Sequence, residues 1–262
     1  MVSAFEHRRP FIGFPGFAFM FRRRIIISNR TDGPQTVTRA ALEDDFHHFR
    51  VEVTGIGGRV SKVGGEAPRK PYTLCSHAIG QLEALVGMPL AGTSHEVTRV
   101  TDPTGQCTHL FELAGLAIAA AARGTPRRQY DVAVPPRVAD RTHPTLARDG
   151  IPCLEWNVAG SVIEGPAPYA GVGLYQGMAR WALSTLDAEE AEAALVLRRG
   201  TGISRGRGMN LDAQVHAQPT GNCFVQQPQR AQQAIRVVGS TLDFAAHPAD
   251  LCADDLAWLA FA

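Results

Sequence analysis

Alternation of apolar and polar residues, interrupted by short turns, dominates the first quarter of the chain. Segments of this kind predict four β-strands, at residues 23–30, 35–42, 46–55 and 59–63. Turn residues at 31–34 and 55–58 separate the first two strands and the last two. Consecutive strands joined by such short turns predict an antiparallel meander.

Helical periodicity is clearest at residues 107–123. Apolar side chains recur there at positions 110, 113, 114, 117 and 118, and Gly124 and Pro126 follow. Further helices are expected at 75–87, 175–186 and 188–199, further strands at 95–102, 129–135 and 153–160, and a strand or a helix at 230–239. Strands and helices without regular βαβ alternation predict an α+β fold with a largely antiparallel sheet and several packed helices. Residues 1–34 are expected to form an N-terminal arm and first strand, and residues 35–262 a single domain.

Composition and charge indicate which kinds of binding partner to expect. The net charge is +1, so electrostatics gives no reason to expect nucleic acid or an anionic membrane. The apolar stretch at 11–21 is too short to span a bilayer and is interpreted as an arm that covers apolar surface. Together with the tail residues Trp258, Leu259 and Phe261, it predicts a homodimer. Five cysteines without a secretory signal predict reduced thiols and a cytoplasmic protein.

The first candidate for chemistry is Asp44-Asp45-Phe46-His47-His48, at the start of a predicted strand. A histidine near a carboxylate is a common general base. Successive strand residues face opposite sides, so His47 and His48 are expected on different faces, and the pattern does not decide which one faces a pocket. Because Asp44 and Asp45 are close in sequence, His48 is predicted as a catalytic residue with Asp45, and His47 as a substrate contact. The alternative is a polar strand edge with exposed imidazoles.

Two similar helix starts, Cys75-Ser76-His77 and Cys107-Thr108-His109, form the second candidate. Together they could supply four zinc ligands. However, residues i and i+2 of a helix point about 200° apart, so each pair is a poor chelate and no metal is expected. The cysteines are either nucleophiles at helix starts or inert buried residues. At the start of a helix His109 is expected to stay neutral and to act as an acid or base.

The third candidate is the arginine-rich loop at 197–208, either a solvated loop or a site for a carboxylate or phosphate, with Arg199 as the predicted contact. No P-loop or dinucleotide-binding motif occurs, so no cofactor is expected. Trp156, Tyr169 and Tyr175 could form the walls of a pocket for a flat ligand, or else be core and turn residues.

In combination, His47-His48 and the run Cys107-Thr108-His109-Leu110 resemble a bacterial family of unknown function. The resemblance covers roughly residues 35–245, with its matching segments at 44–48, 69–75, 82–87 and 107–110, and weaker ones at 197–199 and 222–244. One branch of that family resembles a γ-formaldehyde lyase that converts lignin-derived phenylcoumaran dimers to stilbenes. The resemblance therefore implies a lyase with a small aromatic substrate.

A phenylcoumaran can lose formaldehyde without a lysine imine or a metal, because an aryl ether oxygen two carbons away accepts the electron pair. The enzyme then needs a base, an acid and a flat apolar pocket, which His48, His109, Tyr72 and the aromatic residues of 156–175 would supply. Two alternatives remain: a hydrolase of an aromatic ester or thioester that uses Cys75 or Cys107, and a protein that binds an aromatic ligand without catalysis.

Overall fold

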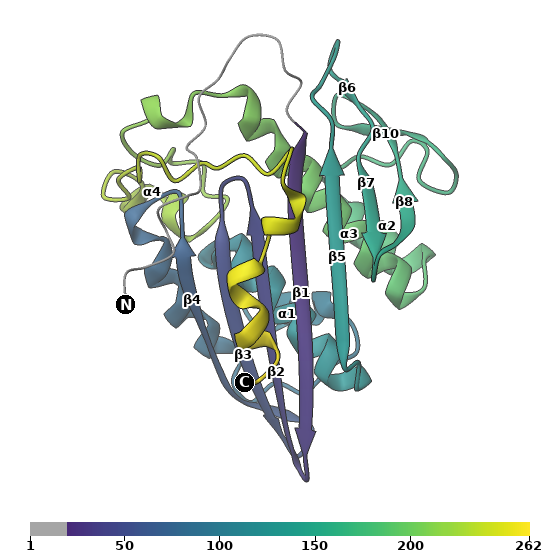
Figure 1. Ribbon diagram of the computed structural model, residues 1–262, viewed down its shortest axis with the longest axis vertical. Helices are drawn as coiled ribbons and strands as arrows, with labels where there is room; N and C mark the ends of the chain where they lie inside the picture. The colour runs from purple at the N-terminus through teal and green to yellow at the C-terminus, as the bar shows by residue number, and fades with distance from the viewer. Residues whose placement is uncertain (1–19) are drawn as a thin grey trace.

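The computed structural model describes residues 20–262, so residues 11–19 of the predicted arm lie outside it (Figure 1). Its main feature is a seven-stranded sheet in the order β4-β3-β2-β1-β5-β7-β8, in which all neighbours are antiparallel. The strands are β1 (Phe21–Asp32), β2 (Gln35–Asp44), β3 (His48–Ile56), β4 (Arg59–Arg69), β5 (Arg127–Val134), β7 (Thr145–Arg148) and β8 (Ile151–Glu155). A second sheet has the order β10-β9-β6, with β6 at Arg141–Thr142, β9 at Asn157–Ala159 and β10 at Val162–Gly165. This arrangement confirms the predicted α+β fold.

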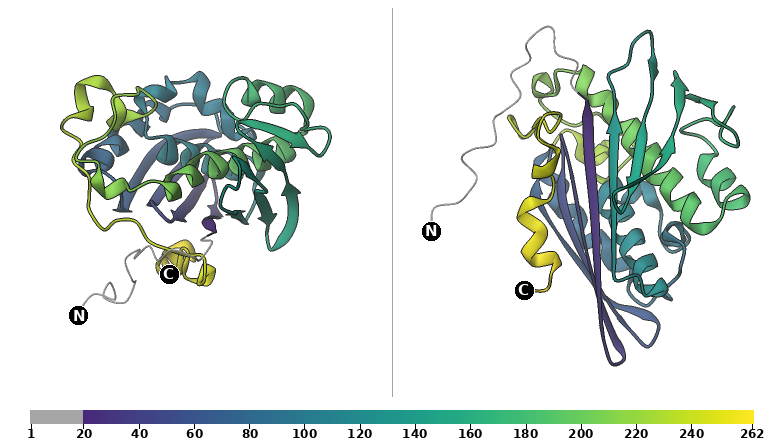
Figure 2. Two further views of the ribbon diagram at one scale, coloured as in Figure 1. Left: turned by 90° about the horizontal axis from the view of Figure 1, so that it is seen from above. Right: turned by 45° about the vertical axis from the view of Figure 1, so that its right-hand side comes forward.

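Helices cover one face of the main sheet, and the C-terminal segment covers part of the other (Figure 2). The α-helices are α1 (Thr108–Arg123), α2 (Met178–Thr185), α3 (Ala188–Ile203), α4 (Pro228–Ala231) and α5 (Leu256–Leu259). The longer 3₁₀ helices are η2 (Thr73–Leu85), η3 (Ser94–Arg99) and η5 (Ser204–Gly208); single 3₁₀ turns occupy η4 (Pro103–Gly105), η6 (Leu211–Ala213), η7 (Phe224–Gln226), η8 (Pro248–Asp250) and η9 (Ala253–Asp255).

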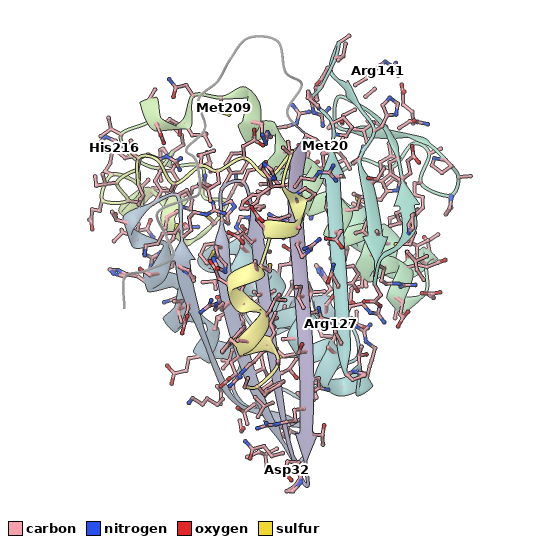
Figure 3. All side chains as sticks on the ribbon, viewed as in Figure 1. Met20, Asp32, Arg127, Arg141, Met209 and His216 are labelled. Atoms are coloured by element: carbon pink, nitrogen blue, oxygen red, sulfur yellow. The ribbon has the colours of Figure 1, made fainter. Side chains whose placement is uncertain are left out.

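Strand β1 lies in the middle of the sheet, between β2 and β5, and runs from beside Met20 to the turn at Asp32 (Figure 3). Its alternate side chains point to opposite faces of the sheet and belong to two separate parts of the core. Ile25 and Ile27 belong to the large core beneath the helices, whereas Ile26 packs with the C-terminal segment on the opposite face. The first strand is thus an integral part of the domain, because it pairs along both of its edges.

Helix α1 packs across β2 and β3 and is the best predicted helix of the chain. It ends at Gly124, which has φ 65° and so adopts a left-handed conformation that glycine tolerates best. Gly115 allows the η3 segment to approach closely, since a Cβ atom there would lie 2.3 Å from the carbonyl oxygen of Ser94. Close packing of α1 on the sheet fixes where its first turn, which contains His109, meets β3.

Two local predictions were wrong, and a third was right about the helix but not about its type. Residues 95–102 contain η3 rather than a strand, because Val97 is buried beneath α1 and the segment packs against that helix instead of along a strand. Residues 75–87 are helical, but as the 3₁₀ helix η2. Residues 230–239 contain only the end of the short helix α4, followed by turns and isolated bridges.

The C-terminal tail packs on its own sheet. Leu259 and Cys252 contact the patch formed by Ile26 and Ala41, and the guanidinium of Arg39 lies over the ring of Trp258 at 5.3 Å. The tail therefore does not supply the free apolar surface on which the homodimer prediction partly rested. Among the helices of residues 20–262, none is long and apolar enough to cross a membrane.

Candidate active site

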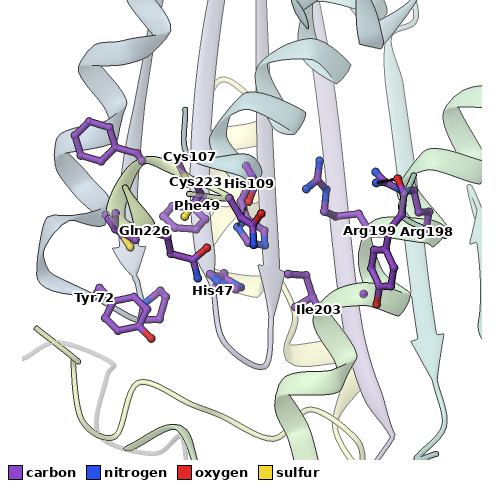
Figure 4. Close-up of a pocket in the computed structure, with 18 residues that line it drawn as sticks. His47, Phe49, Tyr72, Cys107, His109, Arg198, Arg199, Ile203, Cys223 and Gln226 are labelled. Atoms are coloured by element: carbon purple, nitrogen blue, oxygen red, sulfur yellow. Dashed lines mark hydrogen bonds between the residues drawn. The ribbon is translucent and has the colours of Figure 1, made fainter. Parts of the chain in front are cut away.

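A pocket of about 540 Å³ lies on the helix-covered side of the sheet. It opens where the beginning of β3, the first turn of α1, the second half of α3 and the loop before α4 come together. Its lining includes His47, Phe49, Tyr72, His109, Tyr175 and Arg199. Figure 4 shows the two histidines between Tyr72 at one end and the arginines at the other.

The β2–β3 hairpin positions His47. The carboxylate Oδ1 of Asp44 accepts hydrogen bonds from the backbone N–H groups of Phe46 and His47, at 2.8 and 2.9 Å. Such Asx-type capping is a common way for aspartate to stabilise a tight turn. The same oxygen lies 3.0 Å from Nδ1 of His47. One carboxylate thus shapes the turn and orients the imidazole.

His47 and His109 stack on each other, with ring centroids 3.8 Å apart and planes inclined by 29°. His109 is in the first turn of α1, and both rings also lie against Phe49. The Nε2 atom of His109 is buried and has no hydrogen-bond partner among the described residues. A buried polar atom of this kind at a pocket wall is available to a ligand.

Electrostatics keeps Asp44 ionised and both histidines neutral at pH 7. Burial opposes ionisation of Asp44, but His47 and Arg23 outweigh it and hold the pKa of the carboxyl well below its usual range. Burial lowers the pKa of His47, and Asp44 offsets only part of that effect. Burial, His47 and Arg23 lower the pKa of His109 well below its usual range. Because ionised Asp44 can only accept, Nδ1 of His47 carries the proton and Nε2 keeps a lone pair.

Behind the histidines lies a buried ionic network. Arg23, which is 0% exposed, donates from Nε and Nη2 to Oδ2 of Asp44 at 2.9 and 2.6 Å. Its Nη1 reaches Oε2 of Glu112 at 3.4 Å, and the same Glu112 oxygen lies 3.7 Å from Nε of Arg199. Burial raises the pKa of Glu112 although Arg199 opposes the shift. The network therefore connects the base of the pocket to its arginine end.

Asp44, His47 and His109 also form a group whose ligand atoms lie within 4.8 Å of one another, as a metal site requires. The charges around it disfavour a cation. Both oxygens of Asp44 are already occupied by donors, and Arg23 places a full positive charge against one of them. A divalent ion would have to displace Nδ1–H of His47 and compete with that guanidinium. Acid–base chemistry suits this group better than metal binding does.

The four residues that were considered as zinc ligands, Cys75, His77, Cys107 and His109, do not come together as a cluster in the described part of the chain. His77 is exposed, while Cys75 and Cys107 line the pocket with Cys223. Burial raises the pKa of Cys75 strongly and that of Cys107 to about 11. At neutral pH these thiols stay protonated, which makes them poor nucleophiles.

The predicted acid–base pair of His48 and His109 needs correction, because these two residues lie on opposite faces of the sheet. Residue alternation in β3 puts His48 on the side of the C-terminal segment, where Nε2 lies 2.9 Å from Oδ2 of Asp255. Asp45 is likewise outside this pocket, paired with Arg207 at 2.8 Å in a second cavity. Burial raises the pKa of Asp45 to about 8, despite Arg207.

Among the other predicted residues, Tyr72, Tyr175, Arg199 and His47 line the pocket, whereas two aromatic residues do not. Trp156 is fully buried and packs against Tyr169, with ring centroids 5.4 Å apart, in the core near β9. These two are core residues, the alternative that the sequence left open. Sequence reasoning missed Arg23 and Glu112; Arg23 has the same parity as Ile25 and Ile27 and therefore points into the core, which was a usable signal.

The family described as Protein of unknown function (DUF2889) has a model that matches residues 28–123. The match supports the resemblance to a family of unknown function. It includes Asp44, His47, Tyr72 and His109 but neither Arg23 nor Arg199. A comparison with curated proteins gives no match.

Proposed function

We propose that this protein is a cofactor-free carbon–carbon lyase that releases formaldehyde from the γ-hydroxymethyl group of a phenylcoumaran-type aromatic dimer and leaves a stilbene. The observation that carries the proposal is the neutral His47, oriented by ionised Asp44 and stacked on His109 at the wall of the pocket. The resemblance described above supplies the substrate class.

In the first step Nε2 of His47 takes the proton of the γ-hydroxyl group. The oxygen lone pair forms the C=O bond of formaldehyde while the Cβ–Cγ bond breaks. That electron pair becomes the Cα=Cβ double bond, and the bond from Cα to the aryl ether oxygen breaks to give a phenoxide. Asp44 stabilises the imidazolium that forms on His47, as the carboxylate of a catalytic dyad does.

The second step returns the proton to the phenoxide, so the substrate and the sum of the two products contain the same atoms. Tyr72 is available to help at this point. Burial raises the pKa of its phenol although Arg236 opposes the shift, so it stays a neutral hydrogen-bond donor. Its hydroxyl donates to Oε1 of Gln214 at 3.2 Å and can exchange that acceptor for the phenoxide. In this proposal the γ-oxygen is held by Nε2 of His109, which has no partner within residues 20–262.

The shape of the pocket suits a ligand with two rings. At about 540 Å³ it is within the usual range for small-molecule sites, roughly 300–1,000 Å³. The histidines lie between its ends, where the central Cβ–Cγ bond of a dimer would lie (Figure 4). Phe49, Tyr72 and Phe224 contribute aromatic side chains to the pocket wall.

The substrate provides the first test. A phenylcoumaran with an isotopic label at the γ-carbon should yield labelled formaldehyde and stilbene in equal amounts. The analogue with methyl in place of the γ-hydroxymethyl group lacks the proton whose loss starts the reaction, so it should bind without turnover. Stilbene formation from that analogue, or conversion of the dimer without formaldehyde, would show that the lyase proposal is wrong.

Neighbouring histidines on opposite faces of the sheet provide a matched pair of variants. His47→Gln should lower kcat/KM roughly 10²- to 10⁴-fold, the usual effect of losing a positioned general base. His48→Gln should retain activity, because its imidazole contacts Asp255 on the other face. Loss of activity in His48→Gln alone, with the fold intact by circular dichroism, would restore the assignment made from sequence.

The alternatives give distinct results in the same assays. A hydrolase acting through Cys75 or Cys107 would leave an acyl group on the protein, visible as added mass; the protonated thiols argue against it. A binding protein would bind the dimer and release nothing. A cytoplasmic homodimer stays part of the proposal, and light scattering tests it against the chain mass of 28.2 kDa.

A further inference from the structure

The arginine end of the pocket has a second opening. Arg198 and Arg199, near the end of α3, line both the 540 Å³ pocket and an adjacent cleft of about 320 Å³. Thr108 and Asn222 line both cavities as well. The two spaces therefore meet at these four polar residues.

Positive charge at this junction exceeds what the neighbouring carboxylates balance. Arg198 donates from Nε to the carbonyl oxygen of Leu174 and from Nη2 to that of Tyr175, both uncharged acceptors. Among the residues that the structure describes, the one carboxylate near Arg199 is that of Glu112, at 3.7 Å, which also contacts Arg23. Burial lowers the pKa of Arg198, and Arg199 adds to this effect, so the two guanidinium groups repel each other. An anion between them would relieve that repulsion.

Other groups at the junction suit a carboxylate. Thr108 carries a hydroxyl and Asn222 an amide, both of which donate hydrogen bonds. His95 lies in the adjacent cleft, and burial together with Arg198 lowers its pKa, so it is a neutral donor rather than a third cation. Planar guanidinium groups match a carboxylate with two parallel hydrogen bonds, as they also match a phosphate, and of the two the carboxylate is the smaller group.

From these contacts we infer that the substrate carries a side-chain carboxylate, bound between Arg198 and Arg199. The inference rests on the proposed function for the rest of the ligand. It assigns the two arginines to substrate selection. A dimer whose side chain ends in an alcohol or an amide would leave both guanidinium groups without an anion.

Three forms of one phenylcoumaran, with a side-chain carboxylate, primary amide or alcohol, test the inference directly. The carboxylate should have a KM roughly 10- to 100-fold lower than the amide, with a similar kcat, as expected for charge-assisted hydrogen bonds that form already in the bound substrate. Arg199→Gln should remove that difference by raising the KM of the carboxylate alone, and Arg199→Lys should restore part of it. Arg205→Gln is the matched control, since Arg205 is exposed and bonds to the carbonyl oxygen of Gly160.

The outcomes separate this inference from the lyase proposal. Formaldehyde release from all three forms with equal KM would overturn the carboxylate site and leave the lyase standing. If no form releases formaldehyde, binding of the carboxylated stilbene is measured by calorimetry in the parent protein and in Arg199→Gln. Binding that the substitution weakens at least tenfold supports the carboxylate site without the lyase, and binding that it leaves unchanged overturns the site.

Discussion

Asp44→Asn is the most informative single substitution, because Asp44 serves both the fold and the proposed chemistry. The asparagine carbonyl can still accept from the backbone N–H groups of Phe46 and His47, so the hairpin turn should persist. What is lost is the negative charge against Arg23. Arg23 is 0% exposed, and within residues 20–262 its one remaining charged partner would be Glu112, at 3.4 Å.

The expected cost follows from that burial. Removing one partner of a buried ion pair typically costs about 3–5 kcal/mol, because the remaining charge stays desolvated. Since domains are stable by about 5–15 kcal/mol, the variant should still fold but be clearly weakened. Activity should fall roughly 10²- to 10⁴-fold, because His47 loses the group that orients it and stabilises its protonated form.

Urea unfolding at pH 7, followed by circular dichroism, measures the stability change as a lower midpoint with an unchanged slope. The depressed pKa of Asp44 also determines how the stability difference changes with pH. A carboxyl whose folded pKa is depressed contributes stability above its unfolded pKa, about 3.9, and loses it as pH falls through the folded pKa. The gap between parent and variant should therefore be constant near neutrality and shrink in acid.

Replacing both partners separates burial of charge from catalysis. The double variant Arg23→Met/Asp44→Asn removes both charges but keeps an oxygen that accepts from the turn, so it should recover much of the stability but none of the activity. If the free energy of unfolding of Asp44→Asn lies within about 1 kcal/mol of the parent value, other groups compensate the charge of Arg23. The argument that a buried ion pair organises the site then fails.

Three further outcomes are expected. The acidic limb of the kcat/KM profile should have its midpoint below the ordinary histidine pKa of about 6.5, because burial lowers the pKa of His47 and the base works only when neutral. A midpoint above that value would contradict this assignment. Asp255→Asn, on the opposite face, should cost about 1.5–3 kcal/mol of stability through its bonds to His48 and Arg50 while kcat stays unchanged, and a kcat lowered tenfold would place it in the reaction. Elemental analysis of protein purified without chelator should find well under one equivalent of zinc or iron, since Arg23 occupies the carboxylate of the Asp44–His47–His109 group; stoichiometric metal whose removal abolishes activity would reverse that reading.

Local patterns in the sequence determined the antiparallel strands and the helix at α1, because alternation and helical periodicity reflect one buried face in each element. The same local logic placed His47 and His48 on different faces. It failed for residues 95–102, where an alternating segment forms η3 because it packs under Gly115 of α1 instead of along a strand. Periodicity indicates which residues are buried, but it does not indicate which element they pack against.

Which histidine belongs to the pocket was decided only by tertiary structure. Asp44, His47 and His109 meet because α1 crosses β2 and β3, and Arg199 joins them from helix α3, which begins 65 residues after Arg123, the end of α1. The sequence contains each of these side chains but no rule that relates their distances, since such distances depend on how the helices pack on the sheet. The C-terminal tail covers the opposite face of the sheet, and its Asp255 binds His48 there. The adjacent residues His47 and His48 therefore lie in different environments.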